Sequence, residues 1–238
     1  MPAPELSAVI LCYRAEENVR RVAAGFHAEL AASGVPFELI LVANYDDPAD
    51  RTPALAAEFA RENERVEVLM EPKQGAMGWD MRRGLEAAKG SFLVVIDGDE
   101  QNPFEDVLRA YRLLVDSGAD LVKGRRAERF DGPLRHLVSV VYNALFLLLF
   151  RTRGLWDING KPKGLRRSAY EQLRLSADDW FIDAEIVLQT RDLGLKIKEL
   201  PVVFHQNQAR RSFVRGEAVL EFLRNMARVR LGRSGRRD

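Results

Sequence analysis

A run of five apolar residues, 92–96, ends abruptly in two carboxylates one residue apart, Asp97 and Asp99. Gly90 and Gly98 bound the run, which is typical of a strand covered on both faces in a parallel sheet flanked by helices. Open sheets of this kind bind ligands beyond the carboxyl ends of their strands. Side chains two residues apart in an extended chain point the same way, so this pair can share one hard cation. A surface turn is the competing interpretation, because Asp and Gly are common turn residues.

The rest of the chain repeats this alternation of short apolar runs with amphipathic helical patterns, without internal repeats. It predicts an α/β fold with a mostly parallel, Rossmann-like sheet flanked by helices. The predicted strands are 8–12, 37–42, 66–70, 92–96, 119–122 and 197–204. The predicted helices are 17–32, 53–61, 79–88 and a helix from Pro103 through Val115. We expect one domain over residues 1–238.

The composition is typical of a soluble globular enzyme, with 47% hydrophobic and 30% charged residues and a net charge of +1. Cys12 is the only cysteine, which excludes an internal disulfide and a metal site built from several cysteines. No secretory signal is apparent, and no segment reaches the roughly 20 apolar residues of a membrane-spanning helix. We therefore expect the protein to act on the cytoplasmic side.

Two segments are predicted to contact a membrane surface. Residues 134–153 are predicted to form a buried or interfacial helix, because their apolar stretch 137–150 is interrupted by polar residues and flanked by arginines. Residues 205–238 carry nine arginines against three carboxylates, a net charge of +6, with apolar residues at roughly helical spacing. C-terminal amphipathic helices of this kind can lie on anionic lipid, although a solvated helix packed on the core would show the same pattern. The sequence thus predicts peripheral contact with the inner face of a membrane.

Several motifs follow one another in an order that narrows the function. They are an opening strand with Tyr13, a glycine-containing segment from Gly75 to Gly90, Asp97-Gly-Asp99-Glu-Gln101, Asp157, and Asp183 with Glu185. The chain resembles the family 2 glycosyltransferases of GT-A fold, closest to the branch that moves sugars onto polyprenyl phosphates, such as dolichol-phosphate mannosyltransferases. The resemblance extends from Ser7 to about Leu231. It implies inverting transfer of a sugar from a nucleoside diphosphate sugar to a polyprenyl phosphate.

The resemblance also assigns a metal site. Asp97, Asp99 and Gln101 match the family residues that coordinate a divalent cation, Mg2+ or Mn2+, on the donor diphosphate. The leaving group gains negative charge as the C1–O bond breaks, and a divalent cation stabilises that charge. We expect loss of either carboxylate to cripple turnover. Gln101 has an alternative role as a cap of the next helix.

On the acceptor side, Arg126 matches a strand-end arginine of the family. Arg135 and Ser139 match a following Arg-x-x-x-Ser-x-x-x-Asn pattern, which ends here at Asn143. Arginine suits a phosphate because its planar fork makes two charged hydrogen bonds. These residues are predicted to hold the acceptor phosphate. An ordinary solvated basic cluster is the alternative.

Two further assignments come from acidic and basic segments downstream. Asp183 is predicted to be catalytic, orienting the attacking group or contacting the transferred sugar, and a helix-capping carboxylate is the alternative for Asp183 or Glu185. Lys163 closes the segment 157–163, which stands in the place of the family's Asp-x-x-Ser-Gly-Phe-Arg but departs from it in the middle. Lys163 is predicted to face the pyrophosphate.

The donor-binding prediction rests on loops that match the family less well. The paired aspartates usual after the second strand are replaced by Ala43 and Asn44. The residues predicted to bind the donor are Tyr13, Asn44, Asp46, Lys73, Gly75, Asp97, Lys163 and Arg211. For Gly75, a helix beginning with ordinary turn glycines is an equal explanation.

Two other functions stay open. One is sugar transfer to a soluble hydroxyl acceptor, with Asp183 as the general base. The other is a non-catalytic module that binds a nucleotide sugar, which the altered donor loops suggest. Nucleic-acid binding is not expected, because no nucleic-acid motif accompanies the basic C-terminal segment. The nucleotide, the sugar, the lipid and the oligomeric state are left open by the sequence.

Overall fold

The computed structural model describes residues 3–129, 133–150, 152, 154–205 and 224–226, without the side chains of 129 and 133–138. Its strands are β1 (Leu6–Leu11), β2 (Phe37–Val42), β3 (Val66–Leu69), β4 (Phe92–Asp97), β5 (Leu121–Arg129), β6 (Lys163–Arg166) and β7 (Ile197–Phe204). Its longer helices are α1 (Asn18–Ala32), α2 (Thr52–Glu62), α3 (Met77–Ala87), α4 (Asp106–Ser117), α5 (Pro133–Phe150) and α7 (Ile182–Asp192). A single turn, α6 (Arg167–Tyr170), follows β6. Every predicted strand, and every helix predicted before residue 154, overlaps an observed element.

The strands form one sheet in the order β3-β2-β1-β4-β6-β5-β7. Every neighbouring pair is parallel except those made by β6, which runs antiparallel to both β4 and β5. The expected mostly parallel α/β sheet is confirmed. The sequence did not predict β6, since its four residues, Lys-Gly-Leu-Arg, contain a glycine and two charges and lack the apolar run that signals a buried strand.

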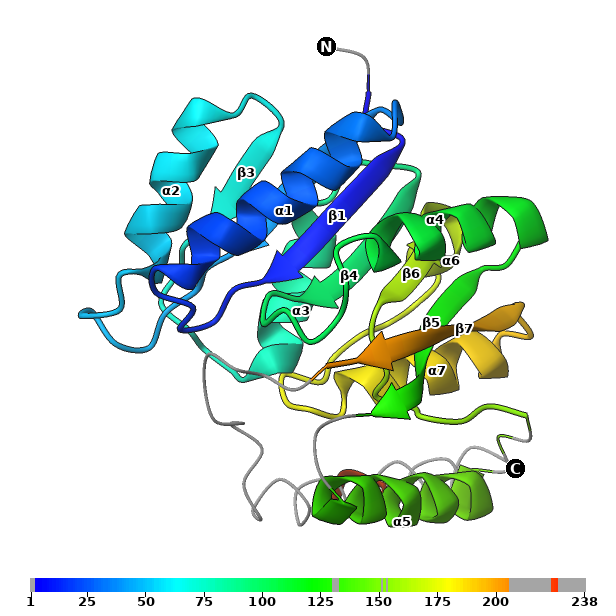
Figure 1. The fold of residues 1–238 in the computed structure, drawn as a ribbon. Coiled ribbons are helices and arrows are strands. Elements are labelled where there is room, and N and C mark those ends of the chain that lie inside the picture. Colours follow the sequence, from blue (N-terminus) through cyan, green and yellow to red (C-terminus); the bar gives the residue numbers. More distant parts are fainter. Residues whose placement is uncertain (1–2, 130–132, 151, 153, 206–223, 227–238) are drawn as a thin grey trace.

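Helices cover both faces of the sheet, as Figure 1 shows. Alternate residues of β1 point to opposite faces, so Ala8 and Ile10 join one core and Val9 and Leu11 the other. The first core is completed by α1, α2 and α4, and the second by α3 and α7. Burial on both sides explains why the strands read as continuous apolar runs.

The helix α5 lies beyond this layered arrangement, at the bottom of Figure 1. Phe146 and Phe150 are buried against the second core. Its opposite side exposes an apolar stripe at helical spacing, defined by Val141, Leu145, Leu148 and Leu149. In the part of the chain that the structure describes, no helix has the length and apolar character needed to cross a bilayer. Most of 205–238, the predicted basic helical segment, lies outside the described residues.

The topology brings the predicted site residues to one edge of the sheet. Parallel strands end at a common edge, and Tyr13, Asn44 and Asp97 lie at or just after the ends of β1, β2 and β4. Since β6 runs the opposite way, the residues that precede it, including Asp157, reach this same edge.

Candidate active site

The aspartate loop follows β4 directly. Asp97 is the last residue of that strand and lies opposite Leu11 of β1 in the register, while both Asp97 and Asp99 are half-buried. The Gln101 backbone N–H donates to Asp99 Oδ1 (3.1 Å), and its side-chain amide donates to the carbonyl of His205 (2.9 Å). In return the His205 N–H donates to the Gln101 carbonyl (2.8 Å), so the end of β7 holds the loop in place.

Whether these residues fit a divalent cation depends on how many ligands they supply. Two carboxylates and an amide oxygen are hard ligands of the kind that Mg2+ and Mn2+ prefer. Among the described residues, no group of three or more His, Cys, Asp or Glu side chains is placed to hold a metal ion. The pair therefore fits a cation that is shared with a substrate, because Mg2+ is commonly bound by one or two carboxylates together with substrate phosphates.

Tyr13 and Asp46, both predicted to bind the donor, contact each other beyond the ends of β1 and β2. The Tyr13 hydroxyl donates to Asp46 Oδ2 (2.7 Å), and Arg14 donates to Oδ1 through Nε (3.1 Å) and Nη2 (3.0 Å). Burial and this hydrogen bond raise the pKa of Tyr13 to about 12. Burial opposes ionisation of Asp46, but the bonds from Tyr13 and Arg14 outweigh it and lower its pKa.

Asn44 is turned inward instead. Its amide nitrogen donates to Asp80 Oδ1 (3.0 Å), and its oxygen accepts from the Glu71 N–H (2.8 Å). Asp80, in the first turn of α3, also pairs with Lys73, and burial raises the pKa of Asp80. Asn44 is 1% exposed with both ends of its amide bonded, so the structure argues against direct contact between Asn44 and a donor. Lys73 lies 4.5 Å from the centre of the Tyr13 ring.

Gly75 has a packing role at the start of α3. A Cβ atom on Gly75 would lie 2.7 Å from Trp79 Cβ and 2.9 Å from Asp178 Cβ. The backbone N–H groups of Ala76 (2.8 Å) and Trp79 (3.2 Å) both donate to the Asp178 carbonyl, so these two amides are not available to a diphosphate. The structure therefore favours the ordinary helix start over the predicted donor contact.

Arg126, predicted to bind the acceptor phosphate, is joined to Asp157. The backbone N–H and Nε of Arg126 both donate to Asp157 Oδ2 (2.8 Å each), and Nη2 pairs with Oδ1. Burial opposes ionisation of Asp157, but the hydrogen bonds and charge of Arg126 prevail and lower its pKa to about 2. Asp157 thereby occupies one edge of the guanidinium fork, so the whole fork is not available to a phosphate.

The predicted face of α5 that carries Ser139 and Asn143 contacts the loop that contains Asp157. The Asn143 amide donates to the carbonyl (2.8 Å) and the hydroxyl (3.3 Å) of Ser139, and its oxygen accepts from the Ile158 N–H (2.9 Å). Ser139 thus lies close to the Asp157 loop, and its predicted contact with an acceptor phosphate stays a prediction. Arg135 lies in α5 with its side chain outside the described residues, and Arg211 lies outside them altogether.

Asp183 is the centre of a buried charge network. Lys161 Nζ donates to both of its oxygens (2.7 and 2.9 Å), and Lys163 Nζ lies 2.8 Å from Oδ1. All three side chains are at most 3% exposed. Burial opposes ionisation of Asp183, but the two ammonium groups outweigh it and lower its pKa. Burial also lowers the pKa of Lys163, to about 8.

Lys163 is held by interior groups on every side. Besides Asp183, its ammonium donates to the carbonyls of Ile158 (2.9 Å) and Gly160 (3.1 Å), and its side chain is fully buried. The structure argues against the prediction that Lys163 faces a pyrophosphate. The sequence did not identify Lys161 or Asp80, although two lysines spaced two apart before a strand are a signal that both point the same way.

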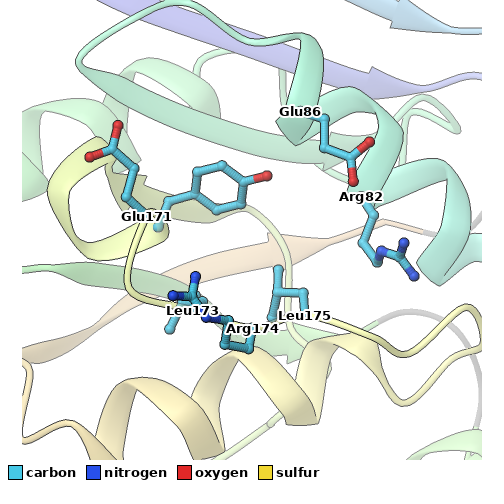
Figure 2. A pocket seen from close by; sticks show the side chains of 7 residues that line it. Arg82, Glu86, Glu171, Leu173, Arg174 and Leu175 are labelled. Carbon is cyan, nitrogen blue, oxygen red and sulfur yellow. The ribbon is translucent and has the colours of Figure 1, made fainter.

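The pocket in Figure 2 lies away from these residues. It has a volume of about 310 Å3 and is lined by Arg82 and Glu86 of α3 and by residues 170–175. Arg82 bonds Asp178 (2.6 Å) and Glu86 bonds Arg83 (2.8 Å), so cations and carboxylates on this wall are already paired. None of the predicted site residues lines this pocket.

Comparison with known proteins decides the family. The model of glycosyl transferase family 2 matches residues 7–174, which include the whole aspartate loop and the Asp157–Lys163 segment. The chain belongs to glycosyl transferase family 2. Its relatives include the low-salt glycan biosynthesis hexosyltransferase Agl6 of Haloferax volcanii, 25% identical over 92% of this chain and 50% of that protein. Dolichol-phosphate mannosyltransferase of Pyrococcus furiosus is 26% identical over 94% of this chain and 63% of its own length.

The family 2 chain spans only part of these relatives. Glycosyltransferase AglD of Haloferax volcanii is 30% identical over 83% of this chain but only 32% of its own length. Among solved structures, glucosyl-3-phosphoglycerate synthase from Mycobacterium tuberculosis, in complex with Mn2+, uridine-diphosphate-glucose and phosphoglyceric acid, superposes with a TM-score of 0.76. It is 18% identical, covering all of this chain and 81% of that one. This likeness confirms the expected GT-A fold.

Proposed function

We propose that this family 2 chain forms a metal-dependent inverting glycosyltransferase, which transfers a sugar from a nucleoside diphosphate sugar to a polyprenyl phosphate at the cytoplasmic face of a membrane. The observation that carries the proposal is the state of Asp183. This carboxylate is buried, and two lysine ammonium groups hold its oxygens. It is not poised to remove a proton.

A general base works best when its pKa lies near the operating pH. Asp183 has a pKa below its ordinary value, and no solvent-facing oxygen is left for a hydroxyl group to approach. A polyprenyl phosphate needs no such base, because its oxygen arrives already ionised. The surroundings of Asp183 therefore support a phosphate acceptor over a hydroxyl acceptor.

Asp97, Asp99 and Gln101 are the residues that would hold the divalent cation. When bound, the cation would neutralise the charge that develops on the nucleoside diphosphate as it leaves. The half-buried aspartates lie at the sheet edge where open α/β sheets bind ligands. Support for a metal and for a uridine nucleotide comes from the Mn2+ and uridine-diphosphate-glucose in the structural neighbour.

The donor would lie over the ends of β1 and β2. Tyr13 is held by Asp46, and the Lys73 ammonium lies under the Tyr13 ring, which makes a firm aromatic surface beside the aspartate loop. The acceptor phosphate would lie on the opposite side, near Arg126, Ser139 and Arg135. Positioning and charge stabilisation then supply most of the rate.

Membrane contact is proposed through α5. Its apolar stripe of Val141, Leu145, Leu148 and Leu149 is exposed, and Leu148 is 76% exposed. An exposed apolar patch of this kind marks an interaction surface. The helix also begins beside the predicted acceptor residues, so a lipid-linked phosphate could reach them from the surface. The names of relatives that act on dolichyl and undecaprenyl phosphates agree with this reading.

Transfer to a soluble acceptor is the second candidate. It is favoured by the phosphoglyceric acid in the structural neighbour, which is not a lipid. A non-catalytic binding module is the third, and it would bind a nucleotide sugar with metal but release no free nucleotide.

The test is a transfer assay with a panel of nucleotide sugars, with and without a polyprenyl phosphate, followed by extraction of the product into organic solvent. We expect a lipid-linked product with one donor. Asp183→Asn should lower kcat by about tenfold or less, whereas loss of a general base costs about 10²–10⁴-fold. Rates are normalised to the fraction of enzyme that binds UDP, since Asp183→Asn disturbs two buried lysines. A larger loss at the chemical step, or product only with a soluble hydroxyl acceptor, would refute the lipid-phosphate mechanism.

A further inference from the structure

Cationic side chains outnumber carboxylates at the sheet edge beneath the site. The members of this charge cluster with side chains at most 19% exposed are Lys123, Arg126, Lys161, Lys163, Asp157, Asp183 and Glu199. Lys123 pairs with Glu199 (2.7 Å), and Arg126 pairs with Asp157. Asp183 is the one carboxylate of the cluster that takes two lysines, so the excess positive charge is located there.

The two lysines on Asp183 differ in how fully they are bonded. Lys163 has three oxygen partners for its three N–H groups: Asp183, Ile158 and Gly160. Lys161 contacts only the two Asp183 oxygens and, at 4.0 Å, the thioether sulfur of Met77, within the described part of the chain. A thioether is a weak acceptor. Lys161 therefore keeps one N–H group without a strong partner.

Because Asp183 pairs with two lysines, Lys161 can leave Asp183 while Lys163 stays bound to it. A buried carboxylate that loses its only cation is costly, by about 3–5 kcal/mol. If Lys161 turned away from Asp183, Lys163 would still neutralise that carboxylate, so the cost falls mainly on Lys161 itself. Glu199 has a weaker reserve than Asp183, because its second cation is the exposed Arg125, 3.7 Å away. Lysine carries its ammonium on a flexible four-carbon stem, and the half-buried Met77 that covers it is equally flexible.

Lys161 is also placed beside the aspartate loop. Its backbone carbonyl accepts from the Asn102 amide (3.4 Å), next to Gln101. In the antiparallel β4–β6 pair, Lys163 lies opposite Val95, so Lys161 and Asp97 leave adjacent strands at the same edge. Met77 is the first residue of α3, which follows the predicted donor residues Lys73 and Gly75, and Asp183 lies in the first turn of α7. The ammonium thus lies between the start of α3 and the start of α7.

We propose that Lys161 is a substrate-binding cation, which exchanges Asp183 for a phosphate oxygen of the bound donor or acceptor. The inference rests on the proposed function, because that function supplies the phosphate groups. A lysine here replaces the glycine of the related Asp-x-x-Ser-Gly-Phe-Arg pattern. The extra charge is therefore a feature of this chain and not of the pattern.

The test measures binding to the full chain by calorimetry, with two probes. UDP with Mn2+ stands for the donor diphosphate, and farnesyl phosphate stands for the acceptor. Lys161→Met keeps the length of the side chain and leaves Asp183 paired with Lys163. We expect it to weaken one probe by at least tenfold and to reduce the salt dependence of that binding. Lys161→Arg should restore most of the affinity, because it restores the charge.

Lys123→Met is the matched control, since it also removes a fully buried lysine from the cluster but leaves the excess charge at Asp183. It should lower the melting temperature and leave both affinities within about twofold. Weakening confined to UDP assigns Lys161 to the donor, and weakening confined to farnesyl phosphate assigns it to the acceptor.

If Lys161→Met binds both probes with wild-type affinity, the inference about Lys161 is overturned and the proposed function still stands. Equal weakening in Lys123→Met would overturn the inference as well, because the effect would then be structural. So would failure of both Lys161→Met and Lys161→Arg to fold, which would make Lys161 a structural residue. If the wild-type chain binds neither probe, the proposed function fails together with the inference.

Discussion

The donor and acceptor sides of the site balance their charges differently. On the donor side, Arg14 pairs with Asp46 and Lys73 pairs with Asp80, one cation to each carboxylate. On the acceptor side, one buried carboxylate, Asp183, takes two lysines, Lys161 and Lys163. A neutral wall does not attract an anion by itself, so under the proposed function the donor diphosphate would depend on a metal brought to Asp97 and Asp99. The acceptor side offers its own positive charge, which suits an acceptor that carries a phosphate.

The largest effect is expected from substitutions in the aspartate loop on the donor side. Asp97→Asn or Asp99→Asn should lower kcat by about 10³-fold or more, because the charge on the leaving diphosphate then lacks its cation. The measurement is steady-state transfer at increasing Mn2+, together with chelation by EDTA in the wild-type enzyme. Glu100→Gln is the control, since this neighbouring carboxylate pairs with Arg21 on the surface. Equal activity of Asp97→Asn and Glu100→Gln would refute the metal site.

The next prediction compares the contributions of a buried ion pair on the acceptor side and an exposed ion pair on the donor side to the free energy of unfolding. Asp157→Asn leaves the Arg126 guanidinium, 15% exposed, without its carboxylate and should cost about 3–5 kcal/mol in the free energy of unfolding. The comparable change on the donor side, Asp46→Asn, breaks pairs with side chains 41–43% exposed and should cost less than about 1 kcal/mol. Urea denaturation measures both. Similar losses of unfolding free energy in the two variants would contradict this difference between the donor and acceptor sides.

The pH dependence of Asp157 offers a separate check on that pair. Its folded pKa of about 2 lies below the ordinary value of 3.8, so its contribution is fully present above about pH 4 and is lost as pH falls toward 2. A shift of this size corresponds to about 2 kcal/mol. The difference in unfolding free energy between the wild type and Asp157→Asn should therefore shrink over this window. A constant difference down to pH 2 would contradict the assignment.

The smallest expected effect concerns the donor surface. Tyr13→Phe removes the hydroxyl that bonds Asp46 and should raise the KM for the donor about threefold to tenfold with little change in kcat, since one hydrogen bond contributes about 0.5–1.5 kcal/mol. Tyr111→Phe is a matched control, because Tyr111 also bonds a carboxylate, Glu5, but from α4. A lower kcat without a change in KM would place Tyr13 in the chemical step.

The sequence predicted the sheet and the position of the aspartate loop because both depend on local signals. Continuous apolar runs mark buried strands, and Asp97 and Asp99 directly follow one. It did not predict β6, whose burial comes from its neighbours and not from its own composition. Side-chain pairing was also beyond reach, since Asn44 meets Asp80 from 36 residues away and Asp183 meets Lys161 from 22 residues away. Their positions in the family's motifs made Asn44 and Lys163 resemble ligand-binding groups, whereas the fold uses both internally.

In the sheet, the antiparallel strand β6 lies between β4 of the donor half and β5 of the acceptor half. β1 to β4 carry the donor side and the aspartate loop, while the segment from β5 to β6 carries Arg126, Ser139, Asp157 and Lys161. Both borders of this segment pair with the rest of the sheet through backbone hydrogen bonds, which are indifferent to side-chain identity. Backbone pairing alone would therefore hold this segment in the sheet after many changes of side chain. The residues that would have to stay are those that pack in the second core, Phe146, Ile158 and Leu165.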